Sequence, residues 1–182
     1  MTNPALMRKM TRYTAWADDV MLNNAAKLPA PELTALRDTL FGSITGTFDH
    51  VLLIGEIFRD HLEGRSNTHT TRHRAEERAF NIVARELRAM NDYYVALADK
   101  WAAEDNGKAL NETIRFTFVG GGDGSMTREE ILLHLVNHAT YHRGFVSTLL
   151  YPFRLDGQAN DLTVFLRDVW PGLVRTDPSL TQ

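Results

Sequence analysis

The sequence contains no cysteine, which excludes disulfide bonds and thiolate metal ligands. Any metal ion would therefore have to be held by nitrogen or oxygen donors. No uninterrupted apolar run approaches the roughly 18 residues that a membrane-spanning helix needs. The first residues also lack the apolar segment of a secretory signal. These absences predict a cytoplasmic protein that does not bind a membrane.

An excess of positive charge is also missing. The chain has 20 Lys and Arg against 23 Asp and Glu, a net charge of −3. This balance gives no electrostatic reason to expect nucleic acid as a partner. At 182 residues with a hydrophobic share of 43%, the chain is long enough to bury a sizeable core. We expect a single domain over residues 1–182.

Four amphipathic patterns predict four long helices, over about residues 4–26, 38–62, 83–101 and 128–150. Asp38 is the expected N-cap of the second helix, and Thr127 with Glu130 forms the capping box of the fourth. Apolar residues of the third pattern recur at steps of three and four, which is the seam of a left-handed bundle. The fold class predicted is all-α, a four-helix bundle.

Two shorter patterns accompany these helices. Residues 113–119 alternate polar and apolar side chains, and glycines at 120–124 follow, which predicts a small β-hairpin before the last long helix. The glycine run lacks the Lys-Ser/Thr ending of a phosphate-binding loop. A brief helix over about residues 160–169 is expected to precede a polar tail.

Three histidines at four-residue intervals are the most informative feature of the fourth helix. His134, His138 and His142 share one helix face with apolar residues that point into a core. A buried polar group without a partner costs about 1–3 kcal/mol. A divalent metal ion is the simplest partner for such a cluster, although hydrogen-bonded core histidines are the alternative.

His50 is the expected third ligand, because it lies in the apolar run 48–54 of the second helix. Gly46, one turn earlier, is expected to leave room for a metal ion or a substrate. His134 is expected to line the pocket, because one ion cannot easily take ligands spread over two helical turns. His61 lies too far along the helix from His50, and Glu56 points away from it. His69 and His73 are expected to be solvated.

The chain resembles the DinB/YfiT-like family of metalloenzymes in three motifs. Tyr13 and Trp16 resemble its first-helix motif, and residues 48–56 resemble the second-helix motif around His50. The most specific match is to the Asn-His-x-x-x-His-Arg-Gly signature, at residues 137–144. Tyr141 stands where many members have another histidine, and Phe145 where they usually have glutamine.

The resemblance implies an up-down-down-up four-helix bundle in which His50, His138 and His142 hold nickel, zinc or iron. It also implies a homodimer, and it places the chain among damage-inducible, stress-response proteins. Relatives include S-transferases and isomerases that activate a low-molecular-weight thiol. Three neutral imidazoles leave the ion an open coordination position, as in catalytic sites.

We therefore expect a metal-dependent enzyme acting on a small-molecule substrate, either a thiol S-transferase or a hydrolase. His134, Tyr141 and Arg143 are the candidate catalytic helpers. The alternative is a non-catalytic stress-response protein that binds the metal without turnover. Because ligand imidazoles must be neutral, metal affinity is expected to decline below about pH 6.5.

Overall fold

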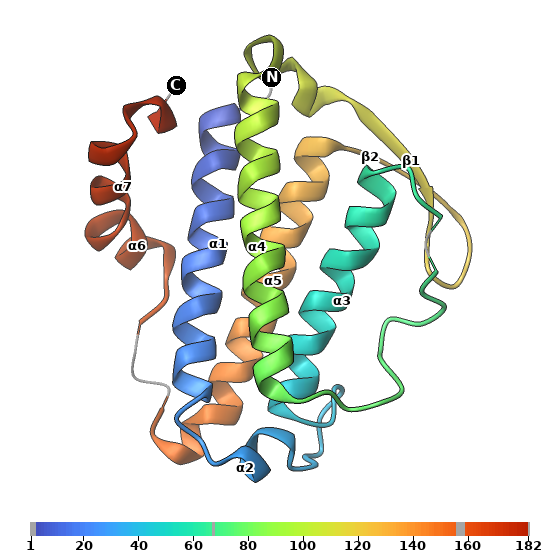
Figure 1. The fold of residues 1–182 in the computed structure, drawn as a ribbon, viewed down its shortest axis with the longest axis vertical. Helices are drawn as coiled ribbons and strands as arrows, with labels where there is room; N and C mark the ends of the chain where they lie inside the picture. Colours follow the sequence, from blue (N-terminus) through green and yellow to red (C-terminus); the bar gives the residue numbers. More distant parts are fainter. Residues whose placement is uncertain (1–2, 67, 156–158, 182) are drawn as a thin grey trace.

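The computed structural model describes residues 3–66, 68–155 and 159–181, and most of these residues are helical. Four long helices lie side by side, and each of them packs against two of the others (Figure 1). In Figure 1, α1 and α5 descend while α3 and α4 ascend. These helices are α1 (Pro4–Ala25), α3 (Ile44–Leu62), α4 (Phe80–Ala103) and α5 (Arg128–Leu150).

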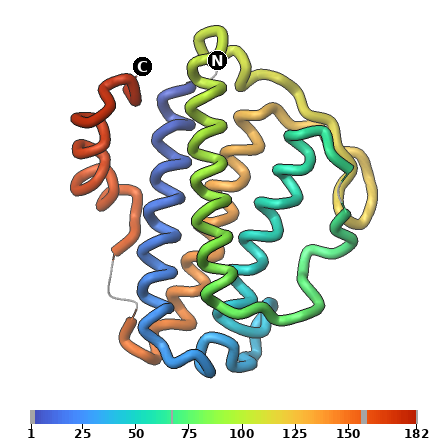
Figure 2. The backbone as a smooth tube through the Cα atoms, in the orientation of Figure 1, coloured from blue at the N-terminus to red at the C-terminus, as the bar shows by residue number. Residues whose placement is uncertain are grey.

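Shorter elements cover the ends and one side of the long helices. Figure 2 shows that the C-terminal segment runs beside α1 and that both chain ends lie at the same end of the molecule. Buried Phe165 and Trp170 pack with Tyr13 of α1 and hold this segment in place. The shorter elements are α2 (Ala30–Thr34), α6 (Leu162–Asp168), α7 (Trp170–Thr176), β1 (Thr113–Thr117), β2 (Asp123–Thr127) and the 3-10 turns Glu104–Asn111, Tyr151–Phe153 and Pro178–Thr181.

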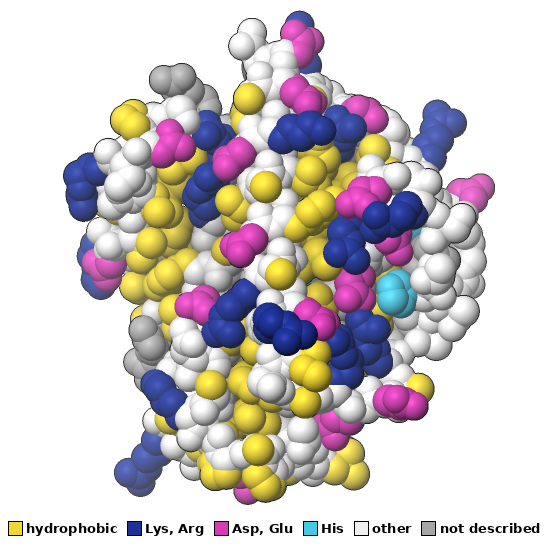
Figure 3. All heavy atoms as spheres, in the orientation of Figure 1, with side chains coloured by type: hydrophobic (Ala, Val, Ile, Leu, Met, Phe, Trp, Pro, Cys, Tyr) yellow, Lys and Arg dark blue, Asp and Glu magenta, His cyan; other side chains and the backbone are white. Residues whose placement is uncertain are grey.

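The core lies between the long helices, and each of them contributes to it. Leu22, Leu52, Leu87 and Leu132, one from each long helix, all belong to the same buried cluster. Acidic and basic side chains are interspersed over the face drawn in Figure 3. Within the described ranges, no helix is both long enough and apolar enough to cross a bilayer.

The start of α3 differs from the prediction, because Ser43 and not Asp38 caps this helix. Ser43 Oγ accepts a hydrogen bond from the Gly46 backbone N–H at 2.8 Å. Gly42 has a φ of 72°, a left-handed conformation that interrupts the helix that was expected to begin at 38. The capping box of α5 is confirmed, since Thr127 and Glu130 bond each other's backbone N–H groups.

The predicted hairpin is confirmed as an antiparallel pair in which Phe116 lies opposite Gly124. A Cβ atom at position 124 would lie 2.4 Å from the Phe116 ring, so the glycine makes room for this ring. Phe116 in turn stacks on His61 and meets Phe58 edge-on, which docks the hairpin on α3. The second strand, β2, begins at Asp123, inside the glycine run that was expected to form the turn. The sequence did not indicate this start, because Gly124 and Ser125 have low strand propensity.

The C-terminal tail also differs from the prediction. Residues 170–176 form α7, where a polar tail containing proline and glycine was expected. Pro171 is compatible with a helix at this place because it stands in the first turn, where its missing N–H group has no intrahelical partner to lose. Buried Trp170 supplies the packing that stabilises this short helix.

A buried ion pair joins α1 to α5, and a hydrogen bond to the same carboxylate adds α4. Arg143 Nη1 donates to Asp18 Oδ1 at 2.8 Å, and Asn91 Nδ2 donates to Asp18 Oδ2 at 2.9 Å. The Arg143 and Asp18 side chains are only 4% and 3% exposed. The pair therefore holds α5 next to α1 and fixes the rotation of α5 about its own axis. Arg143 directly follows His142 in the sequence, so this rotation also sets the direction of His142.

Replacing Asp18 by alanine is expected to lower the free energy of unfolding by about 3–5 kcal/mol, because it leaves the Arg143 charge buried without a partner. Asp19→Ala is the matched control, since Asp19 pairs with Arg88 at the surface, where both side chains are more than 40% exposed. This control is expected to cost less than about 1 kcal/mol. Urea denaturation of both variants measures the difference, and equal losses would contradict the role assigned to the buried pair.

Candidate metal centre

Two of the three expected ligands lie one turn apart on α5. The capping box fixes where α5 begins, and the helical repeat then places His138 and His142 on the side of α5 that faces α3. Their Nε2 atoms are 3.1 Å apart. His142 is buried, with 4% exposure, and His138 is half-buried.

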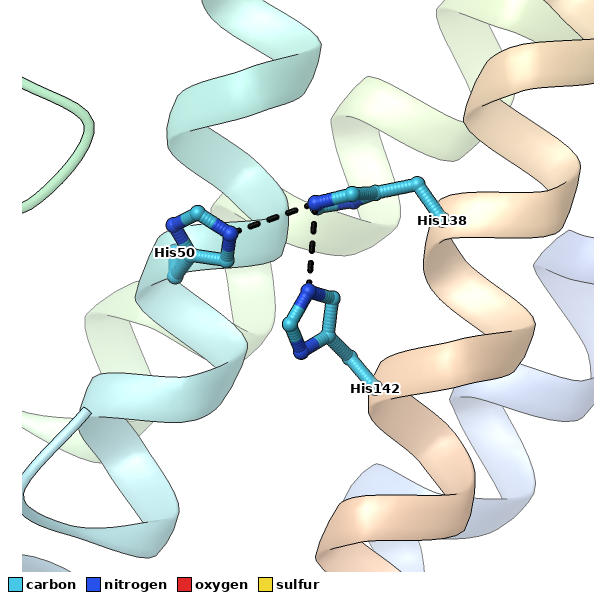
Figure 4. Close-up of side chains that lie close together, drawn as sticks. All are labelled: His50, His138 and His142. Carbon is cyan, nitrogen blue, oxygen red and sulfur yellow. Dashed lines mark hydrogen bonds between the residues drawn. The ribbon is translucent and has the colours of Figure 1, made fainter. Parts of the chain in front are cut away.

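The third expected ligand reaches the same point from α3. His50 Nε2 lies 3.2 Å from His138 Nε2, and Figure 4 shows the three rings pointing toward one another between the two helices. Ring nitrogens of His50, His138 and His142 all lie within 4.8 Å of one another. The structure therefore brings together the three residues that the sequence predicted as ligands.

The hydrogen bond on the far side of His50 determines which of its nitrogens carries the proton. His50 Nδ1 lies 2.8 Å from the backbone oxygen of Arg72, and a carbonyl oxygen only accepts hydrogen bonds. Nδ1 must therefore be the protonated nitrogen. In neutral His50, the Nε2 lone pair then points at the other two rings, which is the arrangement typical of metal-binding histidines.

The three nitrogens fit a cation better than they fit one another. A ring nitrogen with a lone pair repels another lone pair at 3.1–3.2 Å unless a proton or a cation lies between them. His142 Nδ1 is also buried and has no hydrogen-bond partner among the described residues. Nickel, zinc and iron all accept imidazole ligands, so the donor set fits each of the predicted metals.

Burial keeps these histidines neutral. Desolvation, reinforced by the nearby rings of His142, His50 and His134, lowers the pKa of His138 to about 3. Desolvation and the proximity of His50 lower the pKa of His142 to about 4. Burial also lowers the pKa of His50 below its ordinary value. The lowered pKa values favour competition by protons at a lower pH than ordinary imidazoles would show, and the decline of metal affinity on acidification stays a prediction.

An aromatic side chain that no sequence motif singled out covers the centre. The Phe41 ring stacks on His50 at a centroid distance of 4.3 Å and meets the edge of His142 at 5.0 Å. A Cβ atom at position 46 would lie 2.1 Å from the Phe41 carbonyl oxygen, so Gly46 lets the Phe41 segment approach α3. Gly46 also lines a cavity that reaches His50, and the expectation that it leaves room for a metal ion or a substrate stays a prediction.

The predicted helpers lie at different distances from the centre. The ring of His134 is 5.7 Å from that of His138, and the ring of Tyr141 is 5.0 Å from that of His142, although Tyr141 is 71% exposed. Arg143 is engaged by Asp18. Catalytic roles for these three residues stay predictions.

The remaining histidines and Glu56 lie outside the ligand group. Glu56 pairs with Arg74 and lies 3.7 Å from His69, so His69 is less free of contacts than the prediction of a solvated side chain implied. His73 is exposed, yet its ring lies 5.5 Å from that of His50, a contact that the sequence pattern did not indicate. His61 packs on Phe116 of the hairpin.

Comparison with known proteins shows what this chain is similar to. Protein DinB from Bacillus subtilis (strain 168) is 27% identical over 143 residues, which cover 78% of this chain and 83% of that protein. Residues 1–166 match the family described as the DinB family, and this match includes both helices that carry the three histidines. The chain therefore belongs to the DinB family.

Proposed function

We propose that this protein is a metal-dependent enzyme in which His50, His138 and His142 hold one divalent ion. The observation that carries the proposal is the convergence of three neutral ring nitrogens within 4.8 Å of one another. Three protein ligands leave an open coordination position, which is typical of catalytic and not of structural sites. Nickel, zinc and iron are the candidate ions, and a small molecule is the candidate substrate.

Different residues of this chain orient the ligands and shield such a site from water. His50 is oriented by the Arg72 carbonyl, so its Nε2 keeps a lone pair for the ion. The Asp18–Arg143 pair fixes the rotation of α5 and with it the direction of His138 and His142. Phe41 covers one side of the rings and excludes water there. A divalent ion bound to these groups would supply Lewis acidity toward a thiol, a water molecule or a carbonyl group.

We further propose that the four long helices form the up-down-down-up bundle of the family. The antiparallel course of α1 and α3, and the parallel course of α3 and α4 in Figure 1, support this assignment. The connection between α3 and α4 covers residues 63–79, which is long enough to return along the whole helix. Homodimer formation stays a prediction from the resemblance.

Metal analysis of protein produced without an affinity tag tests the ligand assignment. The wild type is expected to bind about one ion per chain, and alanine at position 50, 138 or 142 is expected to weaken binding tenfold or more. His61→Ala is the matched control, because His61 is a buried α3 histidine outside the group. Unchanged binding in the three ligand variants, or an equal loss in the control, would refute the assignment.

Turnover separates an enzyme from a protein that only binds the metal. The metal-loaded wild type is expected to accelerate either thiol addition to an electrophile or the hydrolysis of an ester or amide, and His138→Ala is expected to lose this activity. A metal-loaded protein that is inactive in both assays would favour the non-catalytic alternative over the enzyme.

The stability of the metal-free protein is expected to fall as the pH drops from about 6.5 toward 4. Below about pH 6.5 these histidines are protonated in the unfolded chain but stay neutral in the folded chain until their lower folded pKa is reached, so acidification favours the unfolded state. Each such proton adds a slope of about 1.4 kcal/mol per pH unit. The double variant His138→Gln, His142→Gln is expected to show a shallower slope by urea denaturation, and an identical slope would contradict the assigned pKa values.

A further inference from the structure

A cavity of about 420 Å³ lies between α3, α5 and the hairpin, directly beside the histidine group. His50 and His138 line one end of it, and it extends from there toward the C-terminal half of α3. Figure 1 shows the hairpin alongside this half of α3. The volume lies within the range of about 300–1,000 Å³ that small-molecule sites occupy.

The wall of this cavity is largely apolar and comes from two separate elements. α3 provides Ile54, Ile57 and Phe58, while the hairpin region provides Phe118, Val119 and Met126. Phe116 holds the hairpin in this place through its ring contacts with Phe58 and His61. Phe118 is 49% exposed, so a large apolar surface remains uncovered. An apolar ligand would bury it.

Histidine and arginine side chains also line the cavity, and two of them have unused hydrogen-bonding capacity; these lining residues are His50, His61, Arg72, His134 and His138. His134 lines it with a ring 4.9 Å from that of Phe58, and within the described ranges its nitrogens have no hydrogen-bond partner. The guanidinium of Arg72 likewise has no carboxylate partner in the part of the chain that the structure describes. In ligand sites of this kind, the polar groups set the orientation of the ligand, and the apolar wall accommodates its bulk.

A second cavity, on the other side of His50, has a different character. It measures about 330 Å³ and reaches only His50 of the three histidines. Its two arginines are already paired, since Arg74 and Arg78 both contact Asp49, and Glu76 and Glu77 add further charge to its wall. A wall with so many charged groups is unsuitable for an apolar ligand.

We propose that the cavity beneath the hairpin binds the apolar part of the substrate, an aromatic or branched aliphatic group about as large as a substituted benzene ring. The reactive end of the substrate then points toward His50 and His138. The orientation toward a bound ion rests on the proposed function, whereas the cavity itself does not depend on it. Phe118 and Val119 thereby become determinants of substrate specificity.

Binding of 4-fluorotoluene to the metal-free protein, followed by ¹⁹F NMR, tests the cavity without any turnover. The wild type is expected to bind this probe saturably at one site. Val119→Trp fills the cavity and Val119→Asp places a charge in its wall, and each is expected to weaken binding at least tenfold. Thr113→Trp is the matched control, because it adds the same bulk at an exposed position of the hairpin and is expected to bind like the wild type. Circular dichroism verifies that each variant is folded.

The position of the probe is tested with Co²⁺-loaded protein. The paramagnetic ion is expected to enhance the relaxation of the bound fluorine, because the cavity adjoins the histidine group. Saturable binding that both Val119 variants retain, or the absence of any saturable binding, overturns the inference. Binding without enhanced relaxation in the metal-loaded protein also overturns it. If the protein fails to bind metal yet binds 4-fluorotoluene in the expected way, the proposed function fails and the cavity assignment stands.

Discussion

Three imidazole rings from two helices occupy one small volume, and burial keeps them from taking up additional protons. His50 Nε2 and His142 Nε2 both lie 3.1–3.2 Å from His138 Nε2, which carries at most one proton when neutral, so a single proton would have to serve both contacts. Low pKa values of about 3 for His138 and about 4 for His142 mean that both rings remain neutral at physiological pH. Such a cluster is costly for the fold by itself, and it becomes favourable when a cation accepts all three lone pairs.

The surrounding structure fixes the rotation and the axial position of α5 relative to α3. The Thr127–Glu130 capping box sets where α5 begins, and the Asp18–Arg143 pair anchors it to α1 in the interior. On the other helix, the Arg72 carbonyl orients His50 from behind. A rotation of α5 by one residue, about 100°, would carry His138 and His142 away from His50. The capping box and the Asp18–Arg143 pair do not touch the three Nε2 atoms, yet the ligand geometry depends on them.

The sequence revealed those parts of the structure that depend on periodicity. Histidines four residues apart in an apolar helix must share a face, so the pair on α5 and the capping box could be predicted. Parts that depend on contacts between distant segments could not. Nothing local indicated that Gly46 serves the approach of the Phe41 carbonyl, or that a glycine opposite Phe116 belongs to a strand. Asp38 is a good helix N-cap by residue type, yet the left-handed Gly42 moved the start of α3 to Ile44.

The placement of ligands on two helices has a consequence for the exchange of the ion. His50 and His138 are 88 residues apart in the chain, so an ion bound to both would act as a reversible cross-link between α3 and α5. Such a link restricts the unfolded chain in the way that a long-loop disulfide does in a protein that contains cysteine. The ion would leave when these two helices separate or a ligand ring rotates. Its residence time would therefore depend on how often the interior between α3 and α5 opens locally.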